Sequence, residues 1–232
     1  MIIFDGDYER IFHQMVGEEK KVDYYLNKCS NGIVKRYRQT RTFPVWYSEA
    51  VTIPSSQNTY MFYYYAKNAD ELDRFNHFYG ALLLLNENNG KRMVITLRSM
   101  TLRELVKGGY RDIDSMGMQV YSGHFFSRYR ERMNLPSDLS ANDVILTFFG
   151  RNGHYFSQLD YDKIVLEKNR HKGNSAFGIE DGIILSEEKD YGSFHLFKHN
   201  TFLSYSTLKQ SQKDATPPIS WMRDQVVRER RV

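Results

Sequence analysis

The longest uninterrupted apolar run of the sequence, Tyr60 to Ala66, constrains the fold more than any other feature. The run has the length of a β-strand, is dominated by aromatic side chains, and offers apolar side chains to both faces of a sheet. It is much shorter than the roughly 18 apolar residues that indicate a membrane-spanning helix, and no other window comes closer to that length. The sequence therefore predicts a sheet protein without a transmembrane helix.

Composition narrows the class of protein. The 232 residues are 41% hydrophobic and 26% charged, which fits one large domain or two small ones and excludes disorder of the whole chain. The single cysteine excludes an internal disulfide and a multi-cysteine zinc site. The first ten residues carry no basic stretch followed by a long apolar one, so we expect no secretory signal. The lone cysteine favours the cytoplasm, and we expect neither a bound metal nor a cofactor. The net charge of +4 does not by itself identify a nucleic-acid binder.

The order of patterns along the chain predicts an α+β fold. Residues 7–40 show helical spacing, with a break expected at Gly17, and an antiparallel hairpin is expected around the Asn-Gly loop at 86–91. The other predicted elements are strands at Val45–Ile53 (one strand or two) and Thr59–Ala66, a turn at 54–58, a helical turn at Thr101–Val106, a loop at Gly108–Gly117, helices at Tyr121–Met133 and Ala141–Phe149, and antiparallel strands at Lys163–Leu166, Ser175–Ile179, Gly182–Ser186 and Phe194–Ser204. We accordingly predict three regions: N-terminal helices and a hairpin sheet at 1–110, a central helix pair followed by a C-terminal sheet at 111–214, and a polar tail at 215–232.

The helix predicted from Tyr121 carries a basic row. His124, Arg128 and Arg132 are spaced i, i+4, i+8 and, at about 100° per residue, fall on one stripe. Histidine can act as acid or base near neutral pH, and arginine offers a fixed charge and a forked donor to phosphate. This combination suits cleavage of RNA without a metal, in which a 2′-hydroxyl attacks the adjacent phosphorus. The plainer alternative is a solvated helix face whose arginines pair with Glu131, Asp138 or Asp143.

Other basic and aromatic residues are candidates for contact with nucleic acid. Tyr129 and Arg130 lie on the same helix, with Arg130 on its far side. The segment 35–41 contains Lys35, Arg36 and Arg38 without an acidic residue and could follow a phosphate backbone. A basic helix end stabilised by the helix dipole explains the same segment more simply.

The pattern His-x3-Arg-x3-Arg at residues 124–132 resembles the core helix of the RelE/barnase-like group of bacterial ribonuclease toxins. The resemblance covers residues 118–210 and implies that an antiparallel sheet follows this helix. It also implies a polar residue on a late strand near the site, which here would be Thr201 or Ser204.

Together these features predict a metal-independent endoribonuclease or RNA-binding domain of toxin-like type. His124 would be the acid or base, Arg128 and Arg132 the phosphate clamp, and His195 or His199 could supply the second proton-transfer group. Simple alternation would place both of these histidines on one strand face with Thr201. The alternative is a non-enzymatic module that binds a protein or a nucleic acid. No dinucleotide fingerprint, phosphate-binding loop, zinc-protease motif or nucleophile elbow is present.

Overall fold

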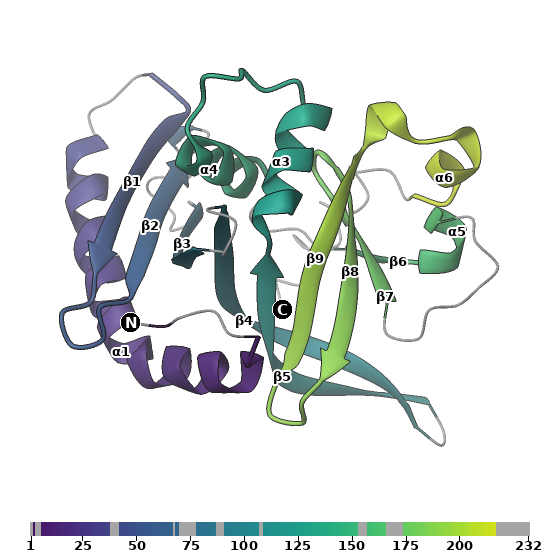
Figure 1. The fold of residues 1–232 in the computed structure, drawn as a ribbon, viewed down its shortest axis with the longest axis horizontal. Helices are drawn as coiled ribbons and strands as arrows, with labels where there is room; N and C mark the ends of the chain where they lie inside the picture. The colour runs from purple at the N-terminus through teal and green to yellow at the C-terminus, as the bar shows by residue number, and fades with distance from the viewer. Residues whose placement is uncertain are drawn as a thin grey trace. The chain divides into compact units, whose positions relative to one another are not determined.

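The computed structural model describes residues 2, 6–37, 42–66, 68–69, 78–86, 91–106, 109–152, 157–165 and 174–216. By its contacts the chain divides into two compact units, Met1–Leu97 and Arg98–Val232. Each unit combines helices with strands (Figure 1), so the predicted α+β class is confirmed. Among the described residues, no helix is both long enough and apolar enough to cross a membrane. The predicted tail from residue 217 onward lies outside the described residues.

The first unit places one long helix on an antiparallel sheet. Its elements are α1 (Tyr8–Tyr37), β1 (Val45–Thr52), β2 (Thr59–Ala66), β3 (Phe78–Asn86) and the start of β4 (Arg92–Val106), with strand order β1-β2-β3-β4. The apolar run Tyr60–Ala66 is buried throughout, as expected for an inner strand. The predicted hairpin is confirmed by the antiparallel register of β3 and β4, in which Leu83 lies opposite Ile95.

Helix α1 continues through Gly17, so the predicted break is wrong. Ile11 and Met15 before the glycine are buried, and Glu18 immediately after it is only 7% exposed. The Glu18 Oε2 atom accepts hydrogen bonds from Asn58 Nδ2 at 2.9 Å and from Tyr60 OH at 2.7 Å. Glycine costs a helix interior about 1 kcal/mol relative to alanine. Burial and these hydrogen bonds on both sides of Gly17 outweigh that cost.

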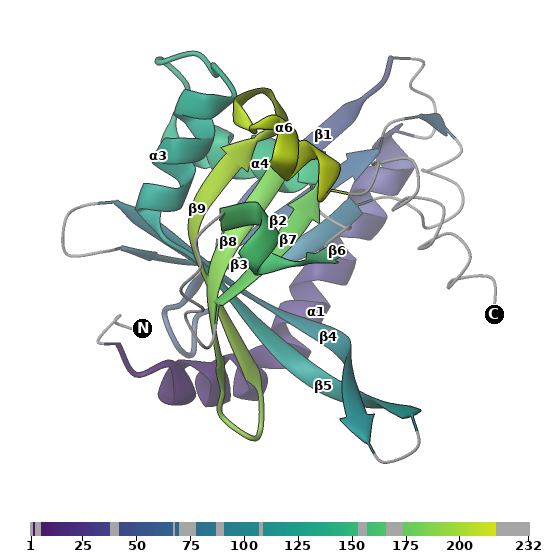
Figure 2. The same ribbon diagram turned by 90° about the vertical axis from the view of Figure 1, so that its right-hand side faces the viewer.

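The second unit contains the helix pair and the C-terminal strands. Its elements are the end of β4, β5 (Gly109–Tyr121), α3 (Gly123–Arg132), α4 (Ala141–Asn152), β6 (Ser157–Leu159), α5 (Tyr161–Val165), β7 (Asn174–Ile179), β8 (Gly182–Asp190), β9 (His195–Ser204), a 3-10 turn at Tyr205–Thr207 and α6 (Gln210–Asp214). The strand order is β4-β5-β9-β8-β7-β6. Strands β5 and β9 are parallel, so the C-terminal sheet is not purely antiparallel as predicted. Figure 2 shows α5 and α6 close to strands β6–β8.

Three predicted elements of this unit are wrong. Residues 101–106 and 109–117 are strand rather than helical turn and loop. The end of β5 is fixed by its ladder to β9, where Gly117 pairs with His195 and Tyr121 with His199, and a pairing so distant in sequence leaves no local signal. In place of the strand predicted at 163–166, residues 163–165 belong to α5, which points Ile164 into a small apolar cluster, and residue 166 lies outside the described residues.

Candidate functional site

Helix α3 holds the basic row in place through a cap and a buried stripe. The Ser122 hydroxyl caps the helix by accepting a hydrogen bond from the backbone N–H of Phe125 at 3.2 Å. Phe125 and Tyr129 are fully buried and pack with Phe148 of α4, with ring centroids 5.1 Å apart in each pair. This packing fixes the rotation of α3 and therefore the side on which its basic residues lie.

The three members of the basic row differ in their surroundings. His124 is exposed. Arg128 Nη1 lies 3.0 Å from Glu131 Oε2, which confirms the alternative that Glu131 pairs with this row. Arg132 is half-buried, and its Nη1 atom is buried without a hydrogen-bond partner among the described residues. The row therefore contains one buried cationic donor that none of the described residues satisfies.

The pKa of Arg132 reflects its partial burial and its position near Arg128. Burial lowers the pKa of Arg132 below its ordinary value, and the positive charge of Arg128 lowers it further, while Glu131 acts in the opposite direction. Arginine nevertheless stays protonated in proteins. The two guanidinium groups are thus close enough to repel each other, and a shared anion would remove that repulsion.

Arg130 and Tyr129 hold the helix in place rather than forming an open surface. Arg130 Nη2 donates a hydrogen bond to the backbone carbonyl of Leu139, in the segment that connects α3 to α4. Tyr129 is fully buried, and its hydroxyl donates to Asp181 Oδ2 at 2.5 Å. The ring of Tyr129 is therefore not available on the surface for stacking on a base.

The two late polar residues do not meet the basic row. A register shift between β8 and β9 leaves Asn200 without an opposite residue in the strand ladder, because Ser186 pairs with His199 and Leu185 with Thr201. This bulge reverses the alternation, so Phe202 contacts Tyr129 of α3, whereas Leu203 packs beside α5 and α6. Thr201 shares the face of Leu203 and points away from α3, contrary to the predicted face shared with His199.

Ser204 lies on the α3 side of the strand by the same alternation, but its hydroxyl is occupied. Its Oγ atom lies 2.9 Å from Ser206 Oγ and 3.3 Å from Thr207 Oγ1, and the residue is buried. Ser204 therefore closes the turn after β9.

His199 is a structural histidine. It is fully buried between Ser186, whose Oγ lies 2.7 Å from Nδ1, and Gln119, whose Oε1 lies 2.6 Å from Nε2. Burial, together with the positive charge of Arg98, lowers the pKa of His199 to about 3. A neutral ring that donates from Nε2 and accepts at Nδ1 satisfies both contacts.

His195 lies four residues earlier on the same strand, about 13 Å from His199 along it. Its Nε2 atom is 3.8 Å from Asp190 Oδ1, and its Nδ1 atom is buried without a hydrogen-bond partner among the described residues. The parallel ladder pairs His195 with Gly117, whereas α3 begins beyond Tyr121 at the far end of that ladder. The structure therefore does not bring His195 to His124.

The second predicted basic segment belongs to the first unit. Lys35 is exposed near the end of α1. The side chain of Arg36 and the whole of Arg38 lie outside the described residues.

A buried carboxylate that the sequence analysis missed connects the elements behind the basic row. Asp181 lies in the turn between β7 and β8 and is 8% exposed. Besides the Tyr129 hydroxyl, it accepts hydrogen bonds from Arg151 Nε at 3.0 Å, Arg151 Nη2 at 2.7 Å and Asn152 Nδ2 at 2.8 Å. Asn152 Oδ1 in turn accepts from the Asp181 backbone N–H at 2.9 Å. These bonds tie α3 and α4 to one strand turn.

The pKa of Tyr129 is consistent with a hydroxyl that donates its hydrogen bond to Asp181. Burial raises the pKa of Tyr129 well above its ordinary value, and the adjacent Asp181 charge raises it further. The phenol therefore stays protonated and acts as a donor.

The local sequence around Asp181 gave no signal beyond a turn, because the residues that it contacts are about 30 and 52 positions away in the sequence.

Metal ligation has no candidate within the ranges that the structure describes, where no group of three His, Cys, Asp or Glu side chains converges. Comparison with protein-family models, with curated proteins and with solved structures finds no match. The resemblance to the RelE/barnase-like group therefore stays a prediction from the sequence.

Proposed function

We propose that this chain binds single-stranded RNA through its phosphate groups, with the basic row of α3 as the contact surface. The observation that carries the proposal is the buried Nη1 atom of Arg132, which has no hydrogen-bond partner in the described part of the chain and lies beside the positive charge of Arg128. A buried donor without a partner costs about 1–3 kcal/mol. A phosphate oxygen would satisfy that donor and neutralise the repulsion between the two arginines.

The geometry of the row favours an extended anion over a small one. His124, Arg128 and Arg132 follow one another at one-turn intervals, about 6 Å apart along the axis at 1.5 Å per residue. Arg128 is 42% exposed, and its contact with Glu131, which is 66% exposed, is a surface ion pair of small net stability. Arg128 can therefore exchange Glu131 for a phosphate at little cost.

Binding is favoured over hydrolysis. A metal-free ribonuclease needs a proton acceptor, a proton donor and cations around one phosphorus atom. Of the expected helpers, Thr201 points to the other face of the sheet, Ser204 is engaged in a turn, and His199 is buried with both ring nitrogens occupied. His124 remains as the only histidine of the proposed surface, so our proposal is recognition of the phosphate backbone.

The proposal is tested by fluorescence anisotropy of a labelled mixed-sequence RNA oligomer with the full chain, in EDTA at low salt. We expect Arg132→Gln and Arg128→Gln each to weaken binding about tenfold, the ratio that corresponds to 1.4 kcal/mol. Lys163→Gln is the matched control, because it removes one positive charge from an exposed side chain on α5 and should change affinity less than twofold. Equal losses in all three variants would contradict a specific role for α3.

The same samples report on cleavage and on the alternative function. We expect intact RNA on a denaturing gel after prolonged incubation. Cleavage by the parent chain that is lost in His124→Ala would contradict a purely binding function and would show that the chain is a ribonuclease. If the folded chain does not retain RNA at low salt, the proposal fails and a protein-binding module becomes the better account of α3.

A further inference from the structure

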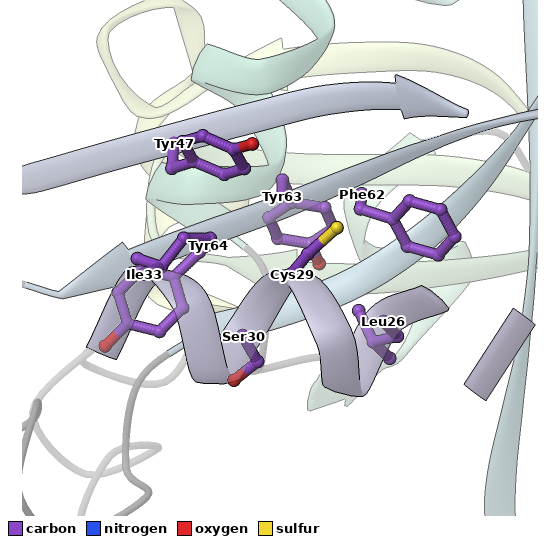
Figure 3. Close-up of a pocket in the computed structure, with 8 residues that line it drawn as sticks. All are labelled: Leu26, Cys29, Ser30, Ile33, Tyr47, Phe62, Tyr63 and Tyr64. Atoms are coloured by element: carbon purple, nitrogen blue, oxygen red, sulfur yellow. The ribbon is translucent and has the colours of Figure 1, made fainter. Parts of the chain in front are cut away.

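A groove in the first unit lies between one side of α1 and strand β1. Its volume is about 330 Å³, and its walls include Tyr25, Lys28, Cys29, Gly32, Tyr47 and Glu49. Pockets of this size hold small organic molecules. Figure 3 shows a smaller pocket that shares Cys29, Ile33 and Tyr47 with the groove and is also lined by Tyr63 and Tyr64 of β2.

One residue of the groove wall on α1 is a glycine, so the helix adds no side chain to the groove at that position. Gly32 lies inside the helix and lines the groove, and a Cβ atom placed there would meet nothing within 4 Å. Glycine weakens a helix interior relative to alanine, so this position carries a cost in helix stability. Gly32 is exposed, so a larger side chain placed there has room to extend along the groove wall.

The polar groups of the groove are ordered around one carboxylate. Glu49 Oε2 accepts a hydrogen bond from the Tyr47 hydroxyl at 2.5 Å and one from Cys29 Sγ at 3.6 Å. Among the residues described, no hydrogen bond to the other oxygen, Oε1, is present, and Glu49 is exposed at the rim. Burial raises the pKa of the Cys29 thiol, and Glu49 raises it further, so Cys29 is a donor rather than a nucleophile.

The charges of the groove balance. Lys28 supplies one positive charge and Glu49 one negative charge, and both are exposed parts of the wall. Two tyrosine rings, Tyr25 and Tyr47, supply aromatic surface. A charged ligand would gain no net attraction here, whereas a flat neutral ring with adjacent donor and acceptor atoms would use every group.

We propose that this groove binds a neutral aromatic heterocycle of about purine size, whose ring N–H donates to Glu49 Oε1 and whose carbonyl oxygen accepts from the Lys28 ammonium. The rings of Tyr25 and Tyr47 contact the flat faces of the ligand. The site is independent of the RNA surface proposed for α3, because all of its residues belong to the first unit.

Theophylline and caffeine form a matched pair of probes for this site. Theophylline carries a ring N–H next to a carbonyl, whereas caffeine has the same rings with that N–H methylated. Binding is measured by calorimetry and by the rate at which a maleimide labels Cys29, the only cysteine in the sequence. We expect theophylline to bind about tenfold more tightly than caffeine and to slow the labelling of Cys29.

Two variants connect binding to the groove. Gly32→Leu should fill the space and abolish binding of theophylline, whereas Gly17→Leu makes the same change at another open position of α1 and should leave it unchanged. Glu49→Gln should reduce the preference for theophylline over caffeine, because the amide loses the charge that strengthens the hydrogen bond.

Three results would overturn the proposal: no binding of theophylline up to its solubility limit, equal affinity for the two probes, or binding that survives in folded Gly32→Leu. If Gly32→Leu fails to fold, Glu49→Gln decides the question through the ratio of the two affinities. Because both probes are neutral and RNA is absent from the assay, these outcomes do not depend on the function proposed for α3.

Discussion

Replacing Asp181 by alanine is expected to be among the most damaging single changes in the second unit. The carboxylate accepts four hydrogen bonds, at 2.5, 2.7, 2.8 and 3.0 Å, three of them from Arg151 and Asn152 and one from the Tyr129 hydroxyl. Two of the three donor residues, Tyr129 and Asn152, are buried and would lose that bond without access to water. Arg151 is 44% exposed and can be solvated again.

The magnitude follows from these partners. Each of the two buried donors left unsatisfied costs about 1–3 kcal/mol, whereas loss of the ion pair with the half-exposed Arg151 adds about 1 kcal/mol or less. Asn152 Nδ2 keeps its bond to the Phe148 carbonyl, so we place Asp181→Ala near the lower end, about 3 kcal/mol. Tyr129→Phe removes only one of the four bonds and should cost about 1–2 kcal/mol.

Urea unfolding of the full chain, followed by circular dichroism, measures both changes. The control is Asp138→Ala, which removes a carboxylate from an exposed position and should stay within about 0.5 kcal/mol of the parent. A double-mutant cycle between Asp181 and Tyr129 should give a coupling energy of about 1 kcal/mol or more. A loss below about 1 kcal/mol in Asp181→Ala would refute the reasoning, since it would mean that these bonds contribute no more than surface contacts.

Three further predictions concern other contacts. The pKa of His199 is about 3 in the folded chain and about 6.5 when unfolded, so the unfolded state binds the proton more tightly. The parent should therefore lose about 2 kcal/mol of unfolding free energy between pH 7.5 and pH 5, and urea midpoints of His199→Gln should lack this loss; equal pH slopes would contradict it. Ser140→Ala should cost about 1 kcal/mol, because the Ser140 hydroxyl accepts from the Asp143 backbone N–H at 3.1 Å and caps α4; exposed Ser137→Ala is its control in the same urea assay. Glu18→Leu should destabilise the first unit by about 2–4 kcal/mol, since it leaves the buried Asn58 and Tyr60 donors unpaired, whereas exposed Glu19→Leu should not; similar melting temperatures of these two variants would rule this out.

The sequence predicted best those elements whose signal is local. The apolar run at 60–66 is a buried strand, the Asn-Gly hairpin pairs as expected, and Ser140 caps its helix. The fold class follows from these elements and their order. The prediction at Gly17 was wrong because tertiary burial on both sides outweighs a modest loss of helix propensity.

Elements that depend on distant partners could not be predicted. Strand β5 is stabilised by pairing with β9, about 80 residues later, and helical propensity at 101–106 is overridden in β4. The sequence predicted the helix that carries the basic row, and Glu131, one of three carboxylates named as possible partners, pairs with Arg128. It could not reveal the bulge at Asn200, which turns Thr201 to the opposite face, because a single extra residue reverses every later position of a strand.

The salt dependence of RNA binding tests the central claim most directly. The slope of log K against log salt concentration counts the phosphates neutralised, at about 0.7 per contact for a single strand. If Arg128 and Arg132 hold phosphates, replacing both by glutamine should reduce the slope by about 1.4, and Lys163→Gln should leave it unchanged. A double variant that retains the parent slope would show that the RNA contacts lie elsewhere, and α3 would then be only a structural helix.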